Sequence, residues 1–264
     1  MAISLRNQLG DTNDSLDKTE AIFGQKSGVM YGTQPFAVRD GRAFEVTSRD
    51  LLNGNNWILT AVTTTGVAVN AISATSATLP ERVVLTTGTT AHDNLQIQFG
   101  QALTMGSATV AAATPFVIRS GFNTHFKCRF RVTTTAADAA FFLGLANVDT
   151  TILASSVIST NAAIGALKAA SGITTNGHIR TGASGTSTAL TTAFTINTWY
   201  EFGFVVQGTG SVVYFWNGVE TGASSLTNIP ANTDLLTPTF AISTGAGAAA
   251  TLELSGMYAW EEMV

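Results

Sequence analysis

Carboxylates are the first side chains to consider, because a glycosidase on a β-sandwich needs two of them, one as acid and one as nucleophile. On a strand such a pair would be spaced two or four residues apart, since alternate residues share a face. The sequence has no E-x-D-x-E or E-x-D-x-x-E run, and Glu253 and Glu261 lie near the chain end without a third partner. Glu261 and Glu262 are adjacent and would point to opposite faces. We therefore expect no catalytic residues and no enzymatic activity.

Metal ligands are equally sparse. The three histidines, at positions 92, 125 and 178, are far apart and show no zinc-ligand spacing. Asn147 and Asp149 form the one oxygen pair that a calcium site could use, but a loop cap by Asp149 is the commoner role. The sequence therefore predicts neither a metal site nor a cofactor.

The densest run of basic residues includes the single cysteine. Lys127, Arg129 and Arg131 alternate with Cys128 and Phe130, as they would on the solvated face of a strand. We interpret the cations as solvated rather than as a phosphate or glycan site, and we place Cys128 in the core. A lone cysteine excludes an intrachain disulfide, and no histidine or asparagine context supports a catalytic thiol.

Four tryptophans, Trp57, Trp199, Trp216 and Trp260, offer the material for a sugar-binding platform. Burial in the core or at a protein interface is the commoner fate of tryptophan, and we favour it.

The composition of the chain limits the classes of partner that it could bind. The chain has 264 residues, a net charge of −4 and a pI near 5.3, with no basic concentration that would predict nucleic-acid binding. No apolar run reaches the roughly 18 residues of a membrane span, and the first residues lack the apolar stretch of a secretory signal. Only 11% of residues are charged, which is low for a freely soluble monomer and suggests an assembly that covers much of the surface.

Charge also divides the chain. Residues 1–50 hold thirteen of the thirty charged residues, and the beginning of this segment lacks strand periodicity. We expect residues 1–44 to form an extended arm that gains structure on a partner, with a short helix possible at residues 15–20. Residues 45–264 are expected to form one domain.

The segment 198–222 predicts two adjacent strands. Four side chains fall on one face at period two: Tyr200, Phe202, Phe204 and Val206. Residues 207–210 (QGTG) supply a turn, residues 211–216 the second strand, and Asn217-Gly218 the following turn.

Other strands are expected at residues 57–59, 61–69, 82–85, 95–99, 116–118, 123–132, 141–145, 240–242 and 252–260. Residues 149–172 allow helix or strand, and residues 173–187 are rich in Gly, Thr and Ser and include turn-prone pairs at 176–177 and 184–185. Frequent turns between short strands predict an all-β, two-sheet antiparallel sandwich. If its topology is that of a jelly roll, whose chain ends come together in one sheet, the last strand pairs near the first strand of the domain.

The hairpin of residues 199–218 (WYEFGFVVQGTGSVVYFWNG) resembles laminin G-like and concanavalin A-like jelly rolls. In order along the chain, residues 126–132 (FKCRFRV), 142–151 (FLGLANVDTT), 236–241 (LTPTFA) and 252–260 (LELSGMYAW) resemble segments of virion structural proteins of tailed bacteriophages. The chain departs from the last segment at residues 256–258 (GMY), which lack the usual aspartate.

This resemblance implies a non-enzymatic virion protein, a capsid decoration or cement protein that binds and stabilises coat subunits. Its partners would be the major capsid protein or other virion subunits, in a homo-oligomer or multi-copy assembly, with no nucleic acid and no membrane. Its location would be the virion, after assembly in the host cytoplasm. The alternatives are a carbohydrate-binding, lectin-like module and a tail or fibre component.

Overall fold

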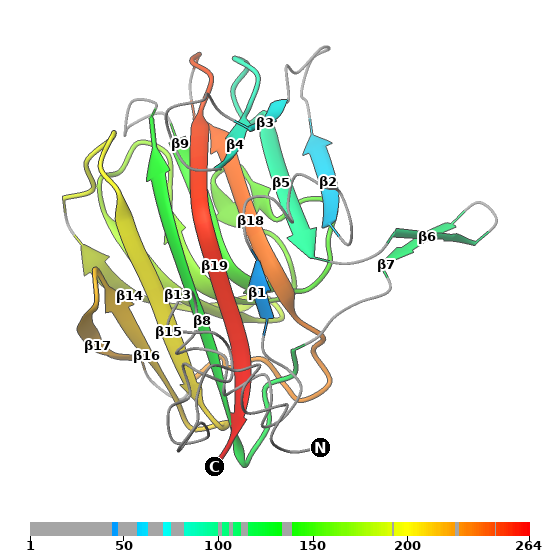
Figure 1. Ribbon diagram of the computed structural model, residues 1–264, viewed down its shortest axis with the longest axis vertical. Helices are drawn as coiled ribbons and strands as arrows, with labels where there is room; N and C mark the ends of the chain where they lie inside the picture. Colours follow the sequence, from blue (N-terminus) through cyan, green and yellow to red (C-terminus); the bar gives the residue numbers. More distant parts are fainter. Residues whose placement is uncertain are drawn as a thin grey trace, which may run out of the picture.

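The protein folds as an all-β sandwich (Figure 1). The computed structural model describes residues 44–46, 57–62, 71–74, 82–99, 102–105, 108–111, 116–133, 139–191, 193–224, 227–245 and 247–264. Every regular element in these ranges is a strand, so none of them provides a helix long enough to cross a membrane. Of the expected arm of residues 1–44, Phe44 is the one residue described, and it begins a short strand; residues 1–43 and the expected strand residues 63–69 lie outside the described residues.

The first sheet, called the β8 sheet here, has eight antiparallel strands in the described residues. Its order is β17 (Val219–Ser224), β16 (Ser211–Trp216), β15 (Tyr200–Gln207), β8 (Phe122–Val132), β19 (Thr251–Met263), β4 (Val83–Thr86) and β3 (Ala71–Ala74). The short strand β1 (Phe44–Val46) also pairs with β19, so the last strand lies beside the first strand described, as expected for a jelly-roll topology.

The second sheet, called the β9 sheet, packs against the first. Its seven described strands run β14 (Ser184–Thr191), β13 (Thr175–Thr181), β12 (Ala162–Lys168), β9 (Ala139–Ala146), β18 (Thr237–Thr244), β5 (Asn94–Phe99) and β2 (Trp57–Val62). Two small hairpins complete the fold: β6 (Ala102–Met105) with β7 (Ala108–Ala111), and β10 (Leu153–Ala154) with β11 (Val157–Ile158). The two-sheet antiparallel jelly roll predicted from the sequence is therefore confirmed.

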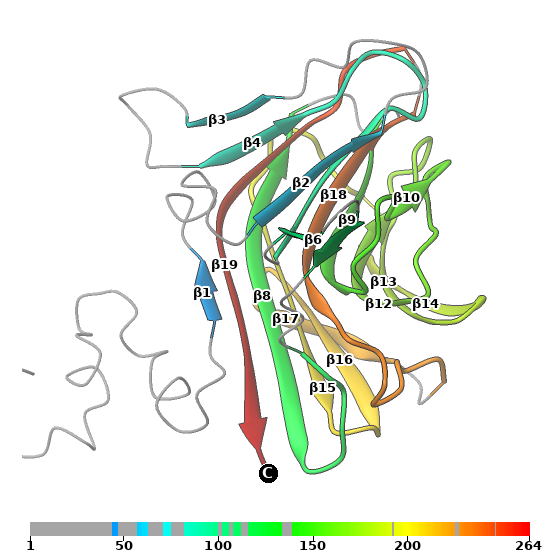
Figure 2. The same cartoon turned by 90° about the vertical axis from the view of Figure 1, so that its right-hand side faces the viewer.

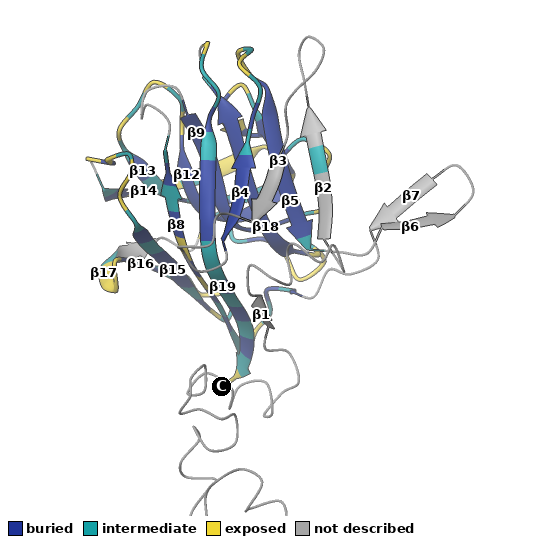
Figure 3. Cartoon of the chain, turned by 45° about the horizontal axis from the view of Figure 1, so that its top comes forward, coloured by how far each residue is buried: buried dark blue, intermediate teal, exposed yellow. Residues whose placement is uncertain are grey.

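Strand periodicity explains which side chains enter the core. On β8, Phe126 and Phe130 are buried, whereas Lys127 and Arg129, one residue further along, are exposed. This alternation is the pattern of a strand with one face on the core and one face toward water. Figure 3 shows the resulting contrast, with buried residues along the sandwich and exposed residues concentrated in the connecting loops.

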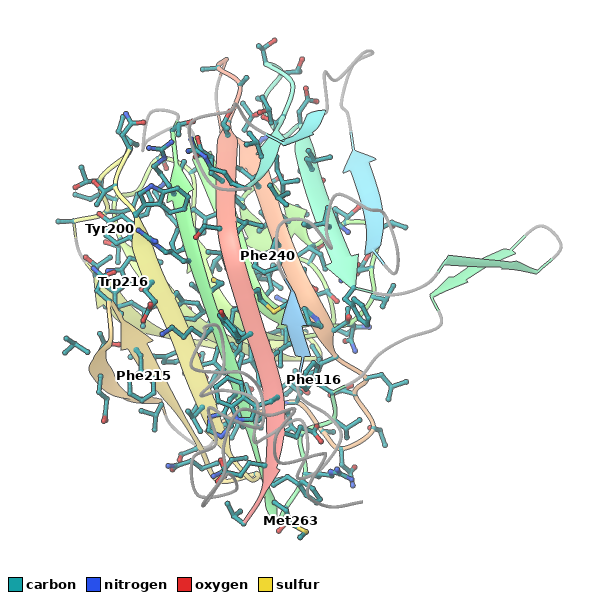
Figure 4. The ribbon with its side chains drawn as sticks, in the orientation of Figure 1. Phe116, Tyr200, Phe215, Trp216, Phe240 and Met263 are labelled. Carbon is teal, nitrogen blue, oxygen red and sulfur yellow. The ribbon has the colours of Figure 1, made fainter. Side chains whose placement is uncertain are left out.

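Aromatic rings join the two sheets. Phe130 of β8 meets Phe141 of β9 edge-on, with 5.3 Å between ring centroids. Tyr200 and Trp216 lie 5.0 Å apart beside them, and Figure 4 shows this pair on β15 and β16, with Phe240 further into the sandwich. Offset and edge-to-face contacts of this kind add to the stability gained from burying the rings.

Residues 149–172, which the sequence left open between helix and strand, form β10, β11 and β12. All seven residues of β12 are buried, because the β10–β11 hairpin covers the outer face of the β9 sheet (Figure 2). A strand buried on both faces loses its period-two pattern and reads as a continuous apolar run. This is why the sequence pattern was ambiguous here.

Two expectations were wrong. The turn-prone pairs at 176–177 and 184–185 do not form turns: they lie in β13 and at the start of β14, and the turn lies at Gly182, which has a φ of +56°. Gly177 serves packing instead, since a Cβ there would lie 2.5 Å from the Tyr214 ring. Residues 116–118 are not a strand either: Phe116 makes a single bridge to Leu236, although Phe116 and Ile118 are buried.

Candidate functional site

The outer face of the β8 sheet gathers charged and aromatic side chains from its three central strands. Cross-strand register places Lys127 beside Tyr258, His125 beside Trp260, and Arg131 beside Glu253. These side chains point away from the core because their neighbours on β8 and β19 point into it. The strands position a continuous, mixed surface of cations, carboxylates and aromatic rings.

At one end of this face, one indole is surrounded by guanidinium groups. The Cζ atoms of Arg131, Arg129 and Arg82 lie 5.1, 5.2 and 6.0 Å from the ring centroid of Trp199. Arg131 donates to both carboxylate oxygens of Glu253, at 2.9 and 2.7 Å, and Arg82 donates to Glu253 as well. We call these five residues the Trp199 cluster. It contains three cations and one anion.

Toward the other end, His125 is held by two contacts. Its ring stacks on Trp260 with centroids 4.6 Å apart, and its Nε2 lies 3.1 Å from Glu262 Oε2. Burial lowers the pKa of His125 from its usual value, while the negative charge of Glu262 opposes that shift.

Two hollows open on this face where the strands carry glycine. The Gly203 hollow, of about 190 Å³, is lined by His125, Trp260 and Phe215 among others. The Gly256 hollow, of about 320 Å³, lies at the irregularity of β19 between Leu254 and Gly256. The ion pair between Lys127 and Glu201, 2.8 Å long, lines both hollows.

The carboxylates considered in the sequence are all engaged in pairs. Glu261 is fully buried and accepts hydrogen bonds from Arg119 at 3.1 Å and from the Val117 backbone N–H at 3.2 Å. Glu262 faces outward to His125, so the prediction that these neighbours point to opposite faces is confirmed. Glu253 is shared by two arginines. The structure thus brings none of these three together as an acid–nucleophile pair.

The possible metal ligands are also dispersed. Asp149 accepts a hydrogen bond from the Thr151 N–H at 3.0 Å, which is the loop cap favoured from the sequence, and Asn147 donates to the Leu235 carbonyl. His178 lies on β13, where burial and then the charge of Arg180 lower its pKa to about 4. Within the ranges given above, no group of three or more His, Cys, Asp or Glu side chains is arranged to hold a metal ion.

The cysteine and three of the tryptophans lie on two different faces of the β8 sheet, the core face and the outer face. Trp216 is in the core and Cys128 is 1% exposed, so both of those placements are confirmed, and burial raises the pKa of the Cys128 thiol. Trp199 and Trp260 lie on the outer face and are partly exposed. The sequence did not reveal the Trp199 cluster, because Arg82 and Glu253 are separated by 171 positions. The one local signal was the basic alternation on β8.

Comparison with known proteins supports the fold. No protein-family model matches the sequence, and no curated protein matches it either. Among solved structures, the chain is similar to a protein of unknown function, SO2946 of Shewanella oneidensis MR-1, with a TM-score of 0.51 and 14% identity. The match covers 84% of this chain and 86% of that one.

Two further similar structures are the carbohydrate recognition domain of Emp47p, with a TM-score of 0.49 and 10% identity, and a botulinum neurotoxin type C structure, with 0.48 and 10%. The match to the Emp47p domain covers 78% of this chain and 88% of that one. The match to the neurotoxin structure covers 85% of this chain and 49% of that one. The molecule is a two-sheet antiparallel jelly-roll sandwich, and at these identities the likeness extends to the fold alone.

Proposed function

We propose that this protein is a non-enzymatic structural protein of a virion, a capsid decoration protein that binds and stabilises coat subunits. The observation that carries this proposal is the pairing of charges on the outer face of the β8 sheet. Glu201 and Glu253, two carboxylates of its central strands, are each bound to a cation, and Glu262 is bound to the His125 imidazole. Carboxylates bound to cations stay ionised and oriented, which suits contacts with a partner, whereas the general acid of a glycosidase must hold a proton.

The composition of this face suits a protein partner. Arginine, tryptophan and tyrosine are enriched at the centres of protein interfaces, and Arg129, Trp199, Tyr258 and Trp260 all lie here. The resemblance to phage virion proteins points the same way, because its motifs supply β8, β9, β15, β16, β18 and β19, which form the frame behind this face. The low charge of the whole chain supports a surface that is covered in an assembly.

The test is to purify intact heads and separate tails from the phage that encodes this sequence, and to measure the copy number of the protein in each. We expect near-stoichiometric recovery with heads. Heads that lack the protein should assemble and then break at a lower temperature or under milder osmotic shock. Recovery with tails would favour the fibre or tail role, and unchanged head stability would reject the cement role.

A carbohydrate-binding role is the second candidate, and the Gly203 hollow is the observation that favours it. Trp260 and Phe215 offer rings against which a sugar could stack, beside the polar Lys127–Glu201 pair. The decoration role predicts no binding on a glycan array and no calcium-dependent change in melting temperature. Saturable glycan binding that Trp260→Ala abolishes, with unaltered capsid stability, would favour the lectin role instead.

A further inference from the structure

The Trp199 cluster leaves one cation without a carboxylate. Arg82 and Arg131 share Glu253, but Arg129 has no anionic partner among the described residues. Its cross-strand neighbour is Glu201, and that carboxylate pairs with Lys127 instead. The Arg129 side chain lies over Trp199, and a cation–π contact does not neutralise its charge.

The Trp199 cluster carries more positive than negative charge, and its positive groups lie close together. Three guanidinium groups lie within about 6 Å of one indole ring, and arginine stays protonated at every physiological pH. Glu253 offsets one of the three charges, so the cluster is locally positive although the whole chain carries a net charge of −4. An incoming anion would relieve repulsion that the folded protein otherwise retains.

The Gly256 hollow gives such an anion a place to enter. It is lined from β8 by Lys127 and Arg129, from β15 by Glu201, and from β19 by Ser255, Gly256 and Tyr258. Lys127 and Glu201 form an ion pair, so Arg129 supplies the positive charge that is left over. The register of β19 is irregular at this point, and a Cβ built at Gly256 would meet no atom of the described residues within 4 Å. An elongated acidic side chain could therefore reach the Arg129 guanidinium with its stem against the Tyr258 ring.

We propose that the Gly256 hollow binds the carboxylate of an aspartate or glutamate side chain presented by a coat subunit. This inference rests on the proposed decoration role and identifies the contact that would make it specific. A planar guanidinium matches a carboxylate through two parallel hydrogen bonds, and the Trp199 ring already holds Arg129 in place. Arg129 thus pairs its charge with a carboxylate of the partner, since the described part of its own chain supplies none.

The experiment uses the full-length protein with two charge-matched variants, Arg129→Glu and Arg180→Glu. Arg180 lies on β13 of the opposite sheet, away from the Gly256 hollow. A fluorescein-labelled hexaglutamate peptide is titrated at low salt and followed by anisotropy, and binding to decoration-free heads is measured at the same salt. Because Arg129 is exposed, Arg129→Ala serves as a second variant that keeps the fold under test.

We expect Arg129→Glu and Arg129→Ala to weaken both peptide and head binding by about tenfold or more, as loss of a charge-assisted pair should. Arg180→Glu should change neither beyond the general effect of its charge. Equal loss in Arg129→Glu and Arg180→Glu would overturn the proposed site. Saturable, Arg129-dependent binding of N-acetylneuraminic acid without peptide binding would also overturn it, in favour of an acidic sugar. Arg129-dependent peptide binding without head binding would retain the site and reject the decoration role.

Discussion

Aromatic side chains on β15 and β16 divide between the core and the outer face according to their position in the strand. Phe204 is 1% exposed and stacks on Phe126, with ring centroids 5.3 Å apart, whereas Phe215 faces outward and lines the Gly203 hollow. Phenylalanine therefore contributes more to the free energy of unfolding at position 204 than at position 215, because folding removes the whole ring from water only at position 204.

Phe204→Ala should destabilise the protein by about 3–5 kcal/mol, the usual cost of removing a fully buried phenylalanine ring. Urea denaturation followed by tryptophan fluorescence measures the change, with Phe215→Ala as the matched control. The control should lose markedly less. A loss below about 1 kcal/mol for Phe204→Ala would show that the core around this ring rearranges to fill the space.

His178 makes stability depend on pH. Its pKa falls from 6.5 to about 4 in the folded protein, so the unfolded chain binds the proton more readily than the folded one. The stabilisation is fully present above about pH 6.5 and is lost as the pH decreases toward 4. His178→Asn should therefore show a smaller decrease in its urea midpoint between pH 7 and pH 4.5 than the unmodified protein.

His92→Asn is the control for that series, because His92 is exposed in a turn and lies far from β13. It should retain the full decrease of the unmodified protein. An identical pH profile for His178→Asn and the unmodified protein would assign the acid sensitivity to other groups.

At the scale of elements, β5 stabilises the segment that the sequence left undefined. Asn94 donates to the Leu153 carbonyl, and Gln96 and Gln98 each exchange two hydrogen bonds with the backbone of residues 147–152. These amides take the place of a neighbouring strand and keep the backbone polar groups satisfied. The β10–β11 hairpin is thereby held against the outer face of the β9 sheet.

Gln96→Leu should release that hairpin. The Asp149 carbonyl and the Ile152 N–H would lose their amide partner, which we expect to cost about 2 kcal/mol. Hydrogen exchange should increase in residues 149–160 more than in β8 or β15. Gln207→Leu, at an exposed position of β15, is the control, and equal protection in both variants would mean that the hairpin is held by its apolar contacts alone.

For the whole molecule, the open prediction is the division of the chain at residue 44. The sandwich closes when β19 pairs with β8, β4 and β1, so the domain uses the chain from β1 onward. Limited proteolysis of the free protein should cut within residues 1–44 first and leave residues 45–264 intact, since a segment ordered only by a partner exposes its backbone to protease. Mass spectrometry of the products locates the cuts. Full protection of residues 1–44 in the monomeric protein would reject the arm.

Local sequence patterns were sufficient to predict strands that have one face toward solvent and one face toward the core. β8 and the hairpin of β15 and β16 could be predicted, because buried and less buried residues alternate along them. The same reasoning placed Cys128 and Phe204 in the core and separated Glu261 from Glu262.

Only the tertiary structure decided what lies on the second face of each strand. The all-buried β9 and β12 gave no periodic signal, because one face packs in the sandwich and the other lies under the β10–β11 hairpin. The turn-prone pair at Gly177 lies within β13, because the ring of Tyr214 occupies the space above it. Trp199, Arg82 and Glu253 meet because β4, β8, β15 and β19 are neighbours in the sheet, and pairing between distant strands depends on the packing of the whole chain rather than on local sequence.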